Sequence, residues 1–205
     1  MRLSFVLFEP MNEMSATGKS TPQASFLQKK HKKITSTYLE NAGAYYLQRF
    51  SASISQFRQV MSRKIAKSCR DHPDQSMETC HVLLENVIQK FINLGYLNDA
   101  AYANALHASL QNKSFARSRI IRTMQQKGVP QDILQEILPE QNENDDLRSA
   151  IKWARRKKLG PYSLREKPNQ QQRDLAAMAR AGFSFECANK ALRLPPEEAE
   201  DLLNT

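Results

Sequence analysis

The fold is decided by residues 91–138. They read Phe-Ile-Asn-Leu-Gly-Tyr-Leu-Asn-Asp over 91–99 and Gln-Gln-Lys-Gly-Val-Pro over 125–130. Gly95 and Gly128 each follow a run of apolar residues at helical spacing and precede another such run. Glycine most easily takes the left-handed conformation just beyond a helix end, so each glycine should end one helix. The stretch therefore predicts a compact helix-turn-helix arrangement.

Two helices are expected between these glycines. Asp99 is placed to cap the first, and Tyr102 and Leu106 would lie on its buried face. The second is predicted over 115–127 and carries a row of arginines, with no acidic residue from Lys113 to Lys127. A short third helix should follow, with Pro130 and Pro139 near its two ends.

Apolar residues at three- and four-residue spacing predict further helices on both sides of this stretch. Ser53, followed three residues later by Gln56, forms a capping-box pattern that opens one of them. Residues 69–79 are expected to form a loop. The other expected helices span 35–49, 79–93, 170–180 and 183–192, with one more opened by Asp145 or Asp146.

The glycine turn recurs, because Gln126-Lys127-Gly128-Val129 aligns with Arg180-Ala181-Gly182-Phe183. We therefore predict an all-α fold of three tandem three-helix repeats that stack into an elongated, curved array, since units this small bury little alone. The predicted organisation is a flexible basic extension at 1–34, repeats at 35–94, 95–139 and 144–194, and an acidic tail at 195–205.

The chain of 205 residues has a net charge of +9, which favours an anionic partner. No apolar run approaches the ~20 residues needed to span a bilayer, and the apolar octet at the start ends at Glu9-Pro10 without a signal-peptide cleavage site. Three cysteines without a CxxC pair suit a reducing compartment. We therefore expect a cytoplasmic protein.

The sequence shows no arrangement typical of an enzyme. It lacks both GxGxxG and the phosphate-binding GxxxxGK[ST] motif, and its four histidines are scattered. Cys69-x-x-His72 and the adjacent pair Cys80-His81 have some likeness to zinc spacing, but adjacent ligands chelate one ion poorly. We expect no catalysis, no cofactor and no metal site.

The chain resembles the RecX regulatory proteins, which modulate the RecA recombinase of bacteria. The resemblance covers about 35–194 and is most specific where Gly-Tyr-Leu-x-Asp at 95–99 precedes Lys-Gly-Val at 127–129. The residues that carry the family pattern are Gly95, Tyr96, Leu97, Asp99, Tyr102, Gly128, Gly182 and Phe183.

This resemblance implies a regulator that binds the RecA–ssDNA filament and inhibits its ATPase and strand-exchange activities. It would thereby modulate recombination, DNA repair and the SOS response. We expect a monomer whose cations face the filament or its DNA: Arg58, Arg63, Lys64, Arg117, Arg119, Arg122, Lys127, Arg155, Arg156, Lys157 and Lys158. The alternative is a helix-turn-helix protein that binds single- or double-stranded DNA directly, without RecA.

Overall fold

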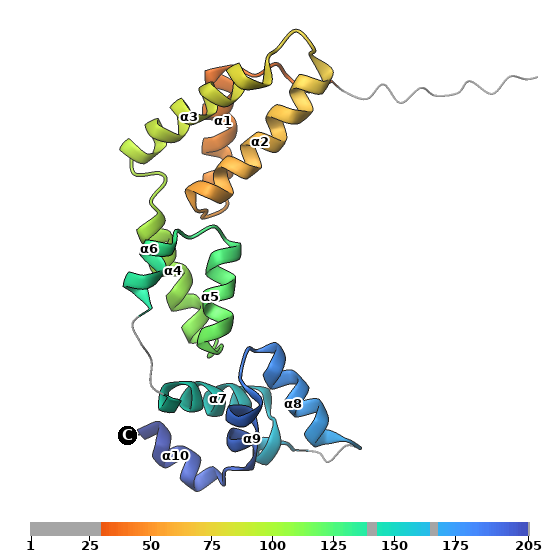
Figure 1. Ribbon diagram of the computed structural model, residues 1–205, viewed down its shortest axis with the longest axis vertical. Coiled ribbons are helices and arrows are strands. Elements are labelled where there is room, and N and C mark those ends of the chain that lie inside the picture. Colours follow the sequence, from red (N-terminus) through yellow and green to blue (C-terminus); the bar gives the residue numbers. More distant parts are fainter. Residues whose placement is uncertain (1–29, 139–142, 165–167, 205) are drawn as a thin grey trace, which may run out of the picture. The chain divides into compact units, whose positions relative to one another are not determined.

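The computed structural model describes residues 30–138, 143–164 and 168–204, which form helices and no strand (Figure 1). The all-α prediction is confirmed. The helices are α1 (Ser36–Leu47), α2 (Ile54–Asp71), α3 (Met77–Asn93), α4 (Asp99–Asn112), α5 (Arg117–Gln126), α6 (Gln131–Ile137), α7 (Glu143–Lys157), the 3-10 turn η1 (Gly160–Tyr162), α8 (Gln170–Arg180), α9 (Phe185–Arg193) and α10 (Pro196–Asn204).

The buried side chains gather in three clusters. In the first, Phe57 of α2 and Phe91 of α3 lie 5.7 Å apart between ring centroids, and Leu39 of α1 completes the centre. Met124 of α5 is fully buried in the second cluster, which joins α4, α5 and α6. The third surrounds Ile151 of α7 and includes residues of α8, α9 and α10. Three clusters of this kind suit a helical repeat protein.

The two junctions between clusters have the same construction. At the first, the Ser53 hydroxyl at the start of α2 donates to the carbonyl of Lys127, beside the glycine turn that ends α5. At the second, the Ser118 hydroxyl at the start of α5 donates to the carbonyl of Gly182, in the glycine turn after α8. The two aligned glycine turns therefore occupy equivalent places. Each accepts a hydrogen bond from a serine near the start of a helix that comes earlier in the chain.

An aspartate completes each junction. The backbone N–H of Ile54 donates to Asp99 Oδ1 at 2.8 Å, and that of Arg117 donates to Asp146 Oδ1 at 3.4 Å. The first N–H groups of a helix have no partner within it, so each carboxylate satisfies the exposed end of a neighbouring helix. The expectation that Asp99 caps its own helix is wrong. Asn98 is the N-cap, and its side chain accepts from Ala101 N–H.

Some predicted helix limits also need correction. Residues 69–71, expected in a loop, complete α2, because Ser68 is buried and its hydroxyl donates to the carbonyl of Lys32. The helix predicted from 115 begins at Arg117, since the Ala116 N–H donates instead to the carbonyl of Ala181. Ser53 does cap α2 as predicted, accepting from Gln56 N–H.

The predicted ends of the chain differ from the structure as well. Within the expected flexible extension 1–34, residues 1–29 lie outside the described residues, but Ile34 is buried and its N–H donates to the Gln75 side chain. In the expected tail, Ala199 of α10 is buried in the third cluster. Both segments contain an apolar residue that short-range patterns did not assign to the core.

Asp174 of α8 is a buried carboxylate that the sequence did not single out. It is 3 % exposed and accepts from the Gly160 N–H at 2.8 Å and from the Gln170 side chain at 2.7 Å. These hydrogen bonds fix the turn after α7 to the start of α8. The end of α7, where Arg155, Arg156 and Lys157 lie, is thereby held against the third cluster.

Candidate functional site

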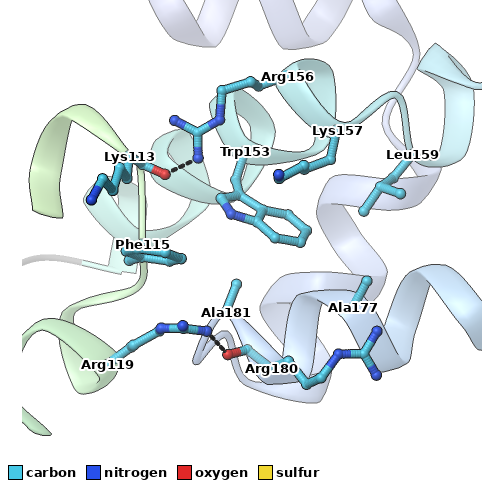
Figure 2. A pocket seen from close by; sticks show the side chains of 10 residues that line it. All are labelled: Lys113, Phe115, Arg119, Trp153, Arg156, Lys157, Leu159, Ala177, Arg180 and Ala181. Carbon is cyan, nitrogen blue, oxygen red and sulfur yellow. Dashed lines mark hydrogen bonds between the residues drawn. The ribbon is translucent and has the colours of Figure 1, made fainter. Parts of the chain in front are cut away.

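A hollow of about 840 Å³ lies where the start of α5, the end of α7 and the end of α8 meet (Figure 2). We call it the basic groove. Five of its lining residues are cations and, among these described residues, none is a carboxylate. The lining consists of Lys113, Phe115, Arg119, Trp153, Arg156, Lys157, Leu159, Ala177, Arg180 and Ala181.

Arg119 is fixed from two sides. Its guanidinium carbon lies 4.1 Å from the centroid of the Phe115 ring, and its Nη1 donates to the backbone carbonyl of Arg180 (Figure 2). The turn at Gly182 approaches the same residue, since a Cβ there would lie 2.7 Å from the Arg119 Cβ. The junction between the second and third clusters therefore sets the position of this arginine.

Arg156 at the end of α7 is fixed in a similar way. Its Nη1 donates to the carbonyl of Asn112 at 3.1 Å, and its Nη2 donates to the carbonyl of Lys113. Figure 2 shows the guanidinium reaching from α7 towards the segment that carries Lys113. The groove thus combines residues that are far apart in sequence.

These arginines are oriented without being neutralised. Both Arg119 and Arg156 donate to neutral carbonyl oxygens, and the ion pairs among the described residues involve other cations. A carboxylate partner would cancel most of the charge, whereas a carbonyl orients the guanidinium and leaves the charge available. The groove therefore concentrates positive potential in a concave surface.

The floor of the groove is apolar. Trp153 is only 7 % exposed, and its ring lies 6.3 Å from that of Phe183 between centroids. The indole Nε1 is buried without a hydrogen-bond partner among the described residues, so packing alone determines the position of this ring. The site offers a rigid floor surrounded by hydrogen-bond donors.

Only part of the predicted binding set lies in this groove. The structure brings together Arg119, Arg156 and Lys157 of that set and adds Lys113 and Arg180. Lys113 opens the stretch without acidic residues, and Arg180 directly precedes a glycine turn. Both signals were present in the sequence, but only the packing of α7 against α5 and α8 joins them.

The remaining predicted cations lie elsewhere. Arg58 forms a bidentate ion pair with Glu85, with hydrogen bonds of 2.7 and 2.9 Å. This pairing raises the pKa of the Arg58 guanidinium and lowers the pKa of the Glu85 carboxyl. Arg155 pairs with Glu200 at 2.7 Å, and Arg117 donates to the carbonyl of Leu138. Outside the basic groove, Arg63, Arg122, Lys127 and Lys158 are exposed and Lys64 is half-buried.

The residues of the family pattern serve the junctions and the cores. Leu97 and Phe183 are buried, Gly128 and Gly182 form the two glycine turns, and Tyr102 is half-buried. Tyr96, in contrast, is 62 % exposed, although its ring meets Phe91 edge-on at 5.6 Å.

Lys127 borders a second hollow, of about 410 Å³, at the junction of the first two clusters. Amide side chains dominate its lining, so it offers both donors and acceptors rather than a concentration of charge. The lining residues are Ser55, Gln56, Gln59, Gln125, Gln126, Lys127 and Gly128.

Among the described residues, no three potential metal-binding side chains come together, including around Cys69, His72, Cys80 and His81. None of the helices in the described ranges combines the length and apolar character needed to cross a membrane.

Comparison with known proteins gives a consistent result. Residues 98–138 match the family model described as "RecX, second three-helix domain". The chain is 34 % identical over 171 residues to the regulatory protein RecX of Myxococcus xanthus, covering 82 % of this chain and 91 % of that protein. It is 29 % identical over 170 residues to the RecX of Agrobacterium fabrum, covering 82 % and 89 %. No solved structure matches.

Proposed function

This chain belongs to the RecX family of regulatory proteins, and we propose that it binds the RecA–ssDNA filament through the basic groove. Binding would inhibit ATP hydrolysis and strand exchange by the filament, and so modulate recombination, DNA repair and the SOS response. The chain would act as a monomeric cytoplasmic regulator without catalysis of its own. The family supplies the filament as partner, and the groove supplies the surface.

The observation that carries this proposal is the orientation of unneutralised arginines. Arg119 and Arg156 reach across the junction between the second and third clusters and are held by carbonyl oxygens. Such cations lose little side-chain freedom on binding, so less of the interaction energy is spent on ordering them. A nucleoprotein filament presents phosphates and acidic side chains, both of which accept hydrogen bonds from guanidinium groups.

We further propose that the three buried clusters correspond to repeats at 35–94, 95–139 and 144–194, and that cations outside the groove extend the contact surface. Exposed Arg63, Arg122, Lys127 and Lys158 would add long-range attraction. Arg58 and Arg155 would add less, because each already pairs with a carboxylate. Arg119 and Arg156 should therefore dominate the affinity.

The test is the inhibition of filament ATPase by a double charge reversal, Arg119→Glu with Arg156→Glu. The matched control is Lys152→Glu with Arg193→Glu, which makes the same change of charge at exposed positions outside the groove. The groove variant should require at least about tenfold more protein for half inhibition, since lost charge pairs at an interface each weaken binding substantially. Equal losses in both variants would show that only net charge matters.

Direct binding to nucleic acid is the second candidate, and the hydrogen-bonding character of the groove favours it. Every charged group that lines the groove is a donor, and the carbonyls of Lys113 and Arg180 already accept from Arg156 and Arg119. A phosphodiester backbone brings acceptors only, whereas a peptide also brings N–H groups that need acceptors. Binding to bare ssDNA and to the filament should be compared across a salt series. Equal affinities, with a steep salt slope on bare DNA, would support action without RecA.

A further inference from the structure

We propose that Cys69 and Cys80 form a peroxide-sensitive thiol pair whose oxidation cross-links α2 to α3. Their Sγ atoms lie 3.9 Å apart, in contact but unbonded. Cys69 is in the last turn of α2 and Cys80 is in the first turn of α3. The two helices pack against each other and are joined by only a short connection, 72–76.

The geometry requires little movement to form the bond. A disulfide needs its sulfur atoms at about 2.05 Å, so the two Sγ atoms must approach by roughly 1.9 Å through rotation of the side chains or a shift of the helix ends. The third cysteine, Cys187 of α9, belongs to a different buried cluster. Pairing within the native protein is therefore restricted to Cys69 with Cys80.

The two thiols differ in environment, which assigns their order of reaction. Cys69 is partly exposed, whereas Cys80 is 2 % exposed. Burial raises the pKa of the Cys80 thiol, and its hydrogen bond with Cys69 raises that pKa further. Since the exposed thiol meets the oxidant first, Cys69 is the site of attack and Cys80 is the resolving thiol.

The reaction balances with hydrogen peroxide as oxidant. The Cys69 thiolate attacks one peroxide oxygen, the O–O bond breaks, and the sulfenic acid of Cys69 forms with hydroxide as leaving group. Cys80 sulfur then attacks the Cys69 sulfur, the S–O bond breaks, and the S–S bond forms. The two thiol protons leave in two molecules of water, and the two electrons lost by sulfur reduce the peroxide.

The cross-link would stabilise a defined part of the surface. The end of α2 and its connection to α3 hold residues 31–34 in place, because Asp71 accepts from the His31 N–H and Gln75 exchanges two hydrogen bonds with the Ile34 backbone. Fixing α2 to α3 restricts the opening of this connection. The segment that includes Lys32 and Lys33 should therefore become more resistant to trypsin upon oxidation.

The experiment treats the reduced full-length chain with hydrogen peroxide, blocks remaining thiols with iodoacetamide after unfolding, and digests the product with trypsin without reductant. The proposal predicts a joined species of residues 68–70 and 71–90 that dithiothreitol separates. It also predicts alkylated Cys187. In parallel samples that are kept folded, oxidation should raise the Tm and slow tryptic cleavage at Lys32. Alkylated Cys80 after peroxide treatment, or a link from either residue to Cys187, would overturn the proposal.

Cysteine variants test the assignment further, and the last of them gives a readout that does not depend on the cross-link. Cys187→Ser should retain the joined peptide, whereas Cys69→Ser should lose it. In Cys80→Ser the sulfenic acid has no resolving thiol, so a second molecule of hydrogen peroxide should oxidise Cys69 to the sulfinic acid and release water. A Cys69 that stays reduced in that variant would show that it is not the peroxide-reactive thiol.

Discussion

The Oδ1 atom of Asp99 accepts a 2.8 Å hydrogen bond from the backbone N–H of Ile54, so the first residue of α4 satisfies the start of α2. This bond joins two buried clusters through a single carboxylate. The Asp146 carboxylate has the same relationship to Arg117 of α5. Because both aspartates lie near the start of the next repeat's first helix, the junction chemistry is repeated along the chain.

Asp99→Ala should destabilise the protein by about 1 kcal/mol, which is typical for loss of a side chain that satisfies a helix start. Asp99→Asn should be nearly neutral, because its amide oxygen still accepts from Ile54. Urea unfolding measures both free energies. An equal loss in both variants would show that charge, rather than acceptance of the hydrogen bond, is what the junction requires.

The pH dependence of the unfolding free energy gives a further check on the role of Asp99. Burial raises the pKa of this carboxyl above its ordinary value, outweighing the hydrogen bond from Ile54, which lowers it. The folded state therefore disfavours the ionised form, and the contribution of Asp99 to stability falls as pH rises through the folded-state pKa. This pH-dependent component should vanish in Asp99→Asn.

Gly43→Ala should destabilise the first cluster, although alanine is the better helix former. A Cβ at Gly43 would lie 2.8 Å from Phe57 Cζ and 2.9 Å from Phe91 Cε2. Overpacking a core costs about 1–3 kcal/mol, which exceeds the gain of about 1 kcal/mol from replacing glycine within a helix. We expect a lower Tm than for the control Asn41→Ala, at an exposed position of α1. A Tm above that of the unmodified chain would mean that the two rings shift freely.

Helical periodicity predicts the class of this fold and most of its helices, because the buried faces repeat at three- and four-residue spacing. It predicts the glycine turns as well, since Gly95, Gly128 and Gly182 all have positive φ. Periodicity does not identify Ile54 as the hydrogen-bond partner of Asp99, because the two residues lie 45 positions apart in the sequence. Local patterns report the ends of helices but do not identify the distant groups that contact them.

The basic groove shows the same limit. Arg119 and Arg156 could be recognised as members of basic clusters, yet their orientation depends on carbonyls contributed by Arg180 and Lys113. Backbone acceptors carry no sequence signature. For this reason the sequence predicts a cationic surface but cannot select which of its cations share a groove.

Asp71 provides a pH test of the anchored segment 31–34. Hydrogen bonds from the His31 backbone N–H and then from its ring lower the pKa of the Asp71 carboxyl. Because the folded-state pKa is lowered, Asp71 contributes to folding stability at pH values above its unfolded pKa of 3.8. This contribution is lost as pH falls through the folded-state pKa. Below that range, hydrogen exchange at the Ile34 amide should accelerate relative to the Leu39 amide in α1.

The control for this titration is Asp71→Asn, which cannot ionise. Its Ile34 amide should exchange at a rate that, after correction for intrinsic chemistry, no longer changes across the acidic range. An unchanged protection profile in the unmodified chain down to the pH of general unfolding would mean that the hydrogen bonds from Gln75 and Ser68 hold the segment without Asp71.

Phe115→Leu should weaken binding to the filament without unfolding the protein. Leucine preserves most of the apolar contact that Phe115 makes with the second and third clusters, but it removes the aromatic face over which Arg119 lies at 4.1 Å. A cation–π contact of this kind contributes about 0.5–1 kcal/mol, so the concentration for half inhibition of the filament ATPase should rise roughly two- to fivefold. Phe115→Tyr keeps the ring and should behave like the unmodified chain. If the leucine and tyrosine variants inhibit equally, Arg119 is oriented by the carbonyl of Arg180 without help from the ring.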